Sequence, residues 1–162
     1  MDVQFRYQEI ILAMKRALQR GEKIYWICPF LEDSEKDDIA TVKNRYHELS
    51  KIFSDYKPVI AHGKLSIEDR QKSIESFLSG QSKVLVATTV IEVGVDVSDA
   101  TIIIIENAEK FGLAQLHQLR GRVGRGENKS YCLLFYKLPI SEIAKFRLET
   151  IRNLNDGFLI SE

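Results

Sequence analysis

The sequence predicts a single three-layer α/β domain, in which a mainly parallel sheet is covered by helices on both faces. Strand-like segments alternate with helix-like segments along nearly the whole chain of 162 residues. The strand-like segments are continuous apolar runs, not alternating ones. Parallel strands that are buried on both faces require such runs, because helical connections cover the sheet on each side.

Helical periodicity marks the first element. Apolar residues recur at i, i+3, i+4 and i+7 from Tyr7 to Leu18, so residues from about 3 to 20 are expected to form an amphipathic helix that ends at Gly21. Ser66, with Asp69 three residues later, resembles a capping box and predicts a helix from there to about Gly80. Further helices are expected over residues 34–52, over residues 114–120 and from residue 141 onward.

Five apolar segments are predicted to be strands. The first is KIYWIC (Lys23–Cys28), which Pro29 ends, and the others cover residues 57–61, 83–87, 101–106 and 130–136. In open α/β sheets, ligands meet the loops at the carboxyl ends of the strands. This rule directs attention to the segments that follow these strands directly, namely residues 28–29, 62–63, 88–89 and 92–96.

The charge balance excludes a whole-chain attraction for nucleic acid. Lys plus Arg and Asp plus Glu number 23 each, so the formal net charge is zero. Between Arg120 and Lys129, however, four cations accompany the single anion Glu127. Any basic surface is therefore expected to be local.

The two cysteines, Cys28 and Cys132, lie within apolar runs and are expected to be reduced core thiols. Neither their spacing nor that of other residues indicates a metal site. The amino-terminal stretch MDVQFRYQEI does not resemble a signal peptide, and no apolar stretch approaches the roughly 20 residues of a membrane span. A cytoplasmic location without membrane association is expected.

The segment QLRGRVGR, which runs from Gln118 to Arg125, is the most distinctive feature. Arg122 and Arg125 are three residues apart, so on a helical turn both project to one side. Two adjacent guanidinium groups favour a polyanion whose phosphate oxygens they can engage. Read alone, the segment is equally typical of a solvated turn rich in Arg and Gly.

A second feature is VLVATTVIEVGVDV, in which a buried strand ends at two hydroxyls, Thr88 and Thr89. Hydroxyls at a strand exit suit the phosphates of a nucleic-acid backbone. Gly94 permits an unusual backbone dihedral, and Asp96 could accept a hydrogen bond from a ribose hydroxyl. The alternative is that Thr88 caps the next turn and Asp96 is a turn residue.

The third feature is His62 with Gly63, followed by Ser66 and Arg70. The helix that begins after Ser66 offers free N–H groups, which favour an anion. No nucleophile or base lies at a useful spacing, so His62 is interpreted as a hydrogen-bonded loop residue and not as a catalyst.

Together these features resemble one known pattern. The stretches IYWICPFLEDSE, AHGKLSIEDRQ, VLVATTVIEVGVDV and IIENAEKFGLAQLHQLRGRVGRG, with RLETIRNLNDGFLI, are similar to the second RecA-like lobe of superfamily 2 helicases. Within that superfamily they resemble the RecG branch-migration helicases, and next the transcription-repair coupling factors. The resemblance covers almost the entire chain and implies a RecA-like fold.

The resemblance also implies residue roles. Arg122 and Arg125 correspond to arginine fingers, and Gln118 to a residue that helps position the γ-phosphate and the attacking water. Gly94 and Asp96 correspond to contacts with the nucleotide ribose. The implied contacts with the DNA backbone are Thr88, Thr89, His62, Gly63 and Arg70.

The sequence departs from a complete motor, because it contains neither G-x-x-x-x-G-K-[ST] nor a DEAD-type acidic motif. In this family those motifs belong to the first lobe, so ATP and Mg²⁺ are expected to be held mainly there. Residues 1–140 are expected to form the RecA-like lobe, and residues 141–162 the start of a helical coupling hairpin whose second arm would follow Glu162. The expected partners are branched or duplex DNA, the first RecA-like lobe and a DNA-binding wedge domain.

Two alternatives remain at this level. One is the motor lobe of a transcription-repair coupling translocase. The other is a non-catalytic nucleic-acid-binding module that uses the RecA-like fold as a scaffold. Sequence flanking these residues, a polymerase-binding module in one case and a missing P-loop lobe in the other, would distinguish them from a RecG-type motor.

Overall fold

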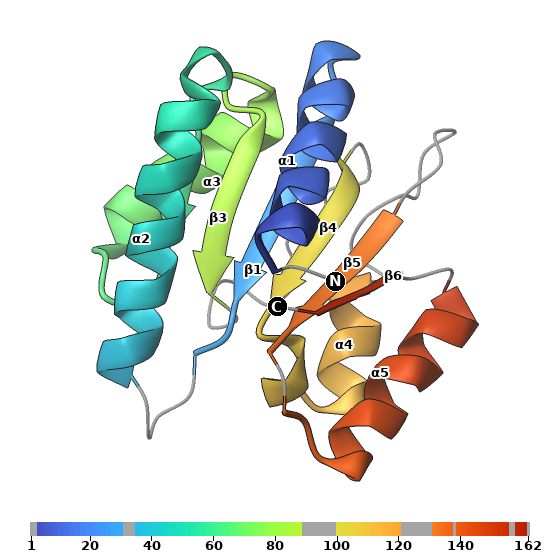
Figure 1. Ribbon diagram of the computed structural model, residues 1–162. Helices are drawn as coiled ribbons and strands as arrows, with labels where there is room; N and C mark the ends of the chain where they lie inside the picture. Colours follow the sequence, from blue (N-terminus) through green and yellow to red (C-terminus); the bar gives the residue numbers. More distant parts are fainter. Residues whose placement is uncertain are drawn as a thin grey trace.

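A six-stranded sheet forms the centre of the molecule in the computed structural model (Figure 1). The structure describes residues 3–30, 35–88, 100–120, 131–137, 139–155 and 158–161. Its strands are β1 (Lys23–Cys28), β2 (Val59–Ala61), β3 (Val84–Thr88), β4 (Ala100–Glu106), β5 (Tyr131–Tyr136) and β6 (Phe158–Ser161). They are ordered β2-β3-β1-β4-β5-β6, and all neighbouring pairs are parallel. The predicted three-layer α/β fold is confirmed.

Helices cover both faces of this sheet (Figure 1). One face carries α1 (Val3–Gln19) and α2 (Glu35–Ile52), and the other carries α3 (Ile67–Ser79), α4 (Leu113–Arg120) and α5 (Glu142–Asn155). Successive strand residues point to opposite faces, so Trp26 packs in the core beneath α1 and α2 while Tyr25 and Ile27 pack in the other core. The continuous apolar runs of the sequence therefore serve two cores at once.

Local signals in the sequence set the helix ends. Gly21 has a φ of +82° at the end of α1, in the region that favours glycine. Ser66 is the N-cap of α3, and its Oγ accepts a 3.1 Å hydrogen bond from the N–H of Asp69. Gly80 ends the same helix with a φ of +88°. These caps agree with the predicted boundaries.

Strand β2 is shorter than the predicted span of residues 57–61. The 3-10 helix Ser54–Tyr56 precedes it, and Lys57 adopts a left-handed φ of +52°. Pro58 has no N–H to donate to a neighbouring strand. The ladder with β3 therefore begins at Val59, which is paired with Leu85.

The carboxyl-terminal segment continues the same sheet. Helix α5 buries Ala144, Leu148 and Ile151, and β6 pairs with β5 in the register Leu133↔Phe158 to Tyr136↔Ser161. The helix expected from residue 141 is present, but β6 was not predicted. Strand β6 thus lies beyond residue 140, while the boundary after residue 140 and a coupling role for residues 141–162 stay predictions.

Candidate functional site

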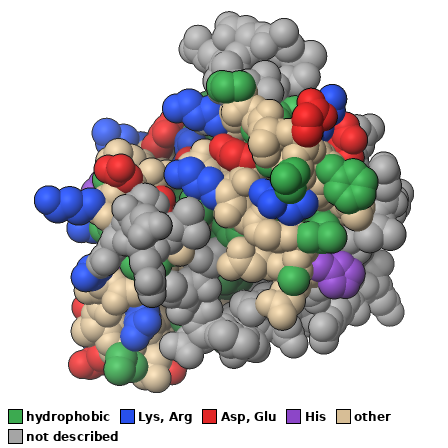
Figure 2. Space-filling view, turned by 90° about the horizontal axis from the view of Figure 1, so that it is seen from below, with side chains coloured by type: hydrophobic (Ala, Val, Ile, Leu, Met, Phe, Trp, Pro, Cys, Tyr) green, Lys and Arg blue, Asp and Glu red, His purple; other side chains and the backbone are tan. Residues whose placement is uncertain are grey.

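The carboxyl ends of the strands bring together the residues that follow them. Thr88 ends β3 and is paired with Cys28 at the end of β1, while Ala61, directly before His62, is paired with Ala87. Figure 2 views the molecule from this edge and shows Lys and Arg side chains interspersed with Asp, Glu and apolar groups. The described part of this face is not uniformly basic, so individual groups must provide any attraction for an anion.

Thr88 presents a buried hydroxyl at this edge. The residue is 1% exposed, and its Oγ1 has no hydrogen-bond partner among the described residues. Burying a hydroxyl without a partner costs free energy, so most buried hydroxyls have a hydrogen-bond partner in the protein or in ordered water. The position suits an oxygen acceptor that approaches the end of the sheet.

His62 is 3% exposed and directly follows β2. Its Nδ1 accepts a 3.1 Å hydrogen bond from the backbone N–H of Lys64, so Nε2 carries the proton in the neutral ring. Burial lowers the pKa of His62, and the charges of Lys43 and Arg70 lower it further. His62 is therefore a neutral loop residue beside two cations, which agrees with its interpretation as a hydrogen-bonded loop residue.

Arg70 lies on the first turns of α3, which Ser66 caps. Its Nε is buried and has no partner among the described residues. Gly63, between His62 and Lys64, is exposed. One edge of the molecule thus carries two buried polar atoms without a described partner, Oγ1 of Thr88 and Nε of Arg70. The predicted contact His62 lies beside them, and Arg70 adds a positive charge.

Helix α4 presents the predicted Gln118. Leu116 and Leu119 are buried against the core, and this fixes the orientation of the helix so that Gln118 is exposed. The remaining predicted positions, Thr89, Gly94, Asp96, Arg122 and Arg125, lie outside the described residues. Their roles stay predictions.

A buried polar cluster at the same edge was missed by sequence reasoning. Glu106, the last residue of β4, is 5% exposed, and its Oε1 accepts 2.8 Å hydrogen bonds from Nε1 of Trp26 and from Nε of Arg45. Nη2 of Arg45 donates to Oε2 of Glu106 at 3.2 Å, so the arginine binds the carboxylate in a bidentate manner. A Glu that ends the run of four isoleucines, together with the single Trp of the chain, was the available signal.

Aromatic rings enclose the same guanidinium. Arg45 lies 4.8 Å from the ring centroid of Trp26 and 5.0 Å from that of Tyr7. Burial alone would lower the pKa of Arg45, but the hydrogen bond and the charge of Glu106 raise it overall. The ion pair joins α2 to β4, and the rings of Tyr7 and Trp26 connect it to α1 and β1.

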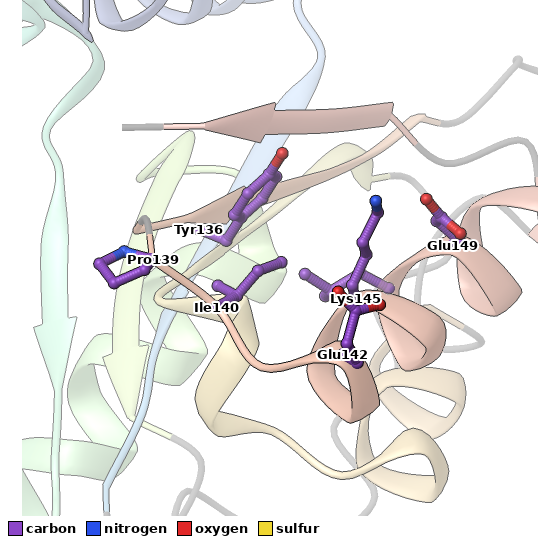
Figure 3. Close-up of a pocket in the computed structure, with 7 residues that line it drawn as sticks. Tyr136, Pro139, Ile140, Glu142, Lys145 and Glu149 are labelled. Atoms are coloured by element: carbon purple, nitrogen blue, oxygen red, sulfur yellow. The ribbon is translucent and has the colours of Figure 1, made fainter.

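A separate cavity of about 390 Å³ lies between the end of β5 and α5 (Figure 3). It combines an apolar lining with charged groups, from Tyr136, Pro139, Ile140, Glu142, Lys145, Leu148 and Glu149. The sequence did not predict this cavity. It is not lined by any of the predicted site residues.

Cys28 and Cys132 are free and buried, as expected. Burial raises the pKa of the Cys132 thiol to about 12, and burial together with the charge of Glu106 raises that of Cys28. Across the described ranges, no three His, Cys, Asp or Glu side chains are grouped as a metal site would require. In the same part of the chain, every helix is too short or too polar to cross a membrane.

Comparison with known families shows the family of the chain. Residues 8–127 match the family model described as the helicase conserved C-terminal domain. The chain belongs to this family. A helicase C-terminal domain is consistent with the RecA-like fold expected from the sequence, and it contains all of the predicted nucleotide and nucleic-acid contacts.

Among relatives of this helicase C-terminal domain is the ATP-dependent DNA helicase RecG. The chain is 44% identical to RecG of Escherichia coli O157:H7 over 97% of its own length and 23% of that protein. It is 43% identical to RecG of Bacillus subtilis strain 168 over 94% of its length and 22% of that protein. The chain thus spans less than a quarter of the length of these curated relatives.

Solved structures give the same assignment of fold. The structure of RecG bound to a three-way DNA junction matches with a TM-score of 0.73 and 39% identity, over 90% of this chain and 18% of that one. The yeast DEAD-box splicing factor Prp28 matches with a TM-score of 0.72 at 17% identity, over 99% of this chain and 33% of that one. The second likeness concerns the fold alone.

Proposed function

We propose that this helicase C-terminal domain is the second motor lobe of an ATP-dependent DNA helicase of the RecG type, which remodels branched DNA in recombination and repair. The observation that carries the proposal is the similarity to RecG over nearly the whole chain, 44% identity across 97% of its residues. The RecG in the matched structure is bound to a three-way DNA junction. Its partners would be branched or duplex DNA, a first RecA-like lobe and a wedge domain, in the cytoplasm.

The donor chemistry of the chain suits a nucleotide phosphate only in part. The sequence offers an exposed amide at Gln118 and guanidinium groups at Arg122 and Arg125, but no phosphate-binding loop. ATP and Mg²⁺ would therefore be held mainly by the first lobe, and ATP would supply the phosphoryl group whose transfer drives the motor. Arg122 and Arg125 would stabilise the charge that develops on that group, while Gln118 would orient the attacking water. Gly94 and Asp96 would contact the ribose.

The part of the edge at the ends of β2 and β3 would contact the DNA backbone. Thr88 and Arg70 each have a buried polar atom with no partner among the described residues, and both can donate a hydrogen bond to a phosphate oxygen. His62 would donate from Nε2, because its Nδ1 is already engaged by Lys64. Gly63 and Thr89 complete the proposed contact set.

DNA-stimulated ATP hydrolysis tests the proposal. The complete helicase is expected to hydrolyse ATP faster with a three-way junction than with linear duplex, whereas the 162 residues alone should not hydrolyse it, because they contain no phosphate-binding loop. Equal stimulation by the two DNAs would contradict the preference for branched DNA. Robust, DNA-stimulated hydrolysis by the 162 residues alone would contradict the composite site.

A further inference from the structure

The edge has two proposed halves, one that contacts DNA through the ends of β2 and β3 and one that faces ATP through α4. The Arg45–Glu106 ion pair lies between them. Glu106 ends β4, and its Oε1 lies 3.9 Å from Sγ of Cys28 at the end of β1. Cys28 is paired with Thr88 on the other side of β1. One carboxylate thus contacts the strand that separates β4 from the proposed DNA contact at Thr88.

On its other side, Glu106 leads directly to the helix that carries Gln118. Asn107 follows with a left-handed φ of +50°, and a short 3-10 helix, Ala108–Lys110, connects it to α4. The chain therefore changes direction immediately after the fixed carboxylate. A displacement of Glu106 would be passed to α4 within a few residues.

Helix α2 carries charged side chains that act on groups in both halves of the edge. Besides Arg45, it carries Asp38, whose Oδ1 lies 3.9 Å from Nζ of Lys110 in the β4–α4 connection. It also carries Lys43, whose charge acts on His62. The Arg45 side chain is held between two aromatic rings, so α2 and β4 cannot slide relative to one another without breaking a buried ion pair.

We infer that Arg45 and Glu106 are positioning residues that couple the DNA-contacting half of this lobe to the half that faces ATP. This inference rests on the proposed function. Neither residue touches DNA or nucleotide in this role, and both act by keeping the ends of β1, β3 and β4 and the start of α4 in one fixed arrangement. Loss of the pair should weaken the stimulation of ATP hydrolysis by DNA more than hydrolysis without DNA.

The test measures ATP hydrolysis by the complete helicase with and without saturating branched DNA. Arg45→Lys keeps the positive charge but loses the bidentate contact with Glu106 and the stacking against Trp26 and Tyr7. Glu106→Gln removes the carboxylate charge. Arg20→Lys is the matched control, because Arg20 forms an ion pair with Glu22 at the same 2.8 Å distance but is largely exposed. The ratio of stimulated to basal rates should fall about 3- to 30-fold in the first two variants and stay unchanged in the control.

The ratio separates coupling from a loss of folded protein, because partial unfolding lowers both rates alike. An unchanged ratio in Arg45→Lys and Glu106→Gln would overturn the inference and leave the proposed function intact. An absence of DNA stimulation in the unaltered helicase would overturn the proposed function, and the inference with it. A ratio reduced equally in Arg20→Lys would also overturn the inference, since the effect would then not be specific to the pair.

Discussion

Oγ of Ser66 accepts a 3.1 Å hydrogen bond from the N–H of Asp69, which fixes the beginning of α3 beside His62. The helix that carries Arg70 therefore begins at a defined residue. Ser66→Ala should destabilise the chain by about 1 kcal/mol, because an N-cap acceptor is lost. Chemical denaturation of the 162-residue chain measures this difference.

Ser66→Asp is the rescue variant, since aspartate is an equally good N-cap, and its free energy of unfolding should stay near that of the unaltered chain. Glu75→Ala, at an exposed position of α3, should change stability by less than about 0.5 kcal/mol. A Ser66→Ala variant as stable as Glu75→Ala would refute the capping role.

The lowered pKa of His62 predicts a pH dependence of stability. The folded state favours the neutral ring, so the contribution is complete above the ordinary value of 6.5 and is lost as the pH falls below it. The free energy of unfolding should therefore decrease between pH 8 and pH 5.5. His62→Gln should show a smaller decrease over this interval, whereas His117→Gln, at an exposed position, should keep the full decrease.

Thr88→Val should separate binding from stability. The buried Oγ1 has no partner among the described residues, so replacing it with a methyl group should leave stability equal or higher. If the hydroxyl donates to a DNA phosphate, the affinity of the complete helicase for DNA should fall about 2- to 10-fold, as expected for one hydrogen bond of about 0.5–1.5 kcal/mol. Fluorescence anisotropy with labelled DNA measures it.

Thr41→Val serves as the comparison, because the Thr41 hydroxyl already donates to the carbonyl oxygen of Asp37 within α2. Its DNA affinity should not change. Equal affinities for Thr88→Val and Thr41→Val would remove Thr88 from the proposed interface.

Arg125→Ala tests the assignment of the arginine fingers. In the complete helicase, ATP turnover should fall by about 10³- to 10⁵-fold, the range known for arginines that stabilise phosphoryl transfer. DNA affinity should stay within about twofold, because this side chain is proposed to face ATP. Turnover that survives the substitution with little loss would show that the assignment is wrong.

Most of the fold could be predicted because its determinants are local. Apolar runs such as KIYWIC define strands, and Gly21, Ser66 and Gly80 mark helix ends by conformations or hydrogen bonds that span a few residues. Strand β6 escaped because it has only four residues and depends on its pairing with β5. Its pattern carries too little information without that neighbour.

The residues at the strand ends of the site could be predicted from the sequence, but the buried polar cluster of Glu106, Arg45 and Trp26 could not. Thr88 and His62 follow apolar runs, so the rule for parallel sheets placed them at one edge. Glu106 is separated in the sequence from Arg45 by 61 positions and from Trp26 by 80 positions. No local periodicity reports such a pairing, because it arises only when α2 packs over the sheet.

The two buried thiols make this domain convenient for site-specific labelling. Thiolate is the species that reacts with maleimides, and the raised pKa values of Cys28 and Cys132, together with their burial, suppress that reaction. A cysteine introduced at an exposed position of α4 would then be the preferred target for a fluorophore. Labelling of this lobe would then not require the removal of Cys28 and Cys132.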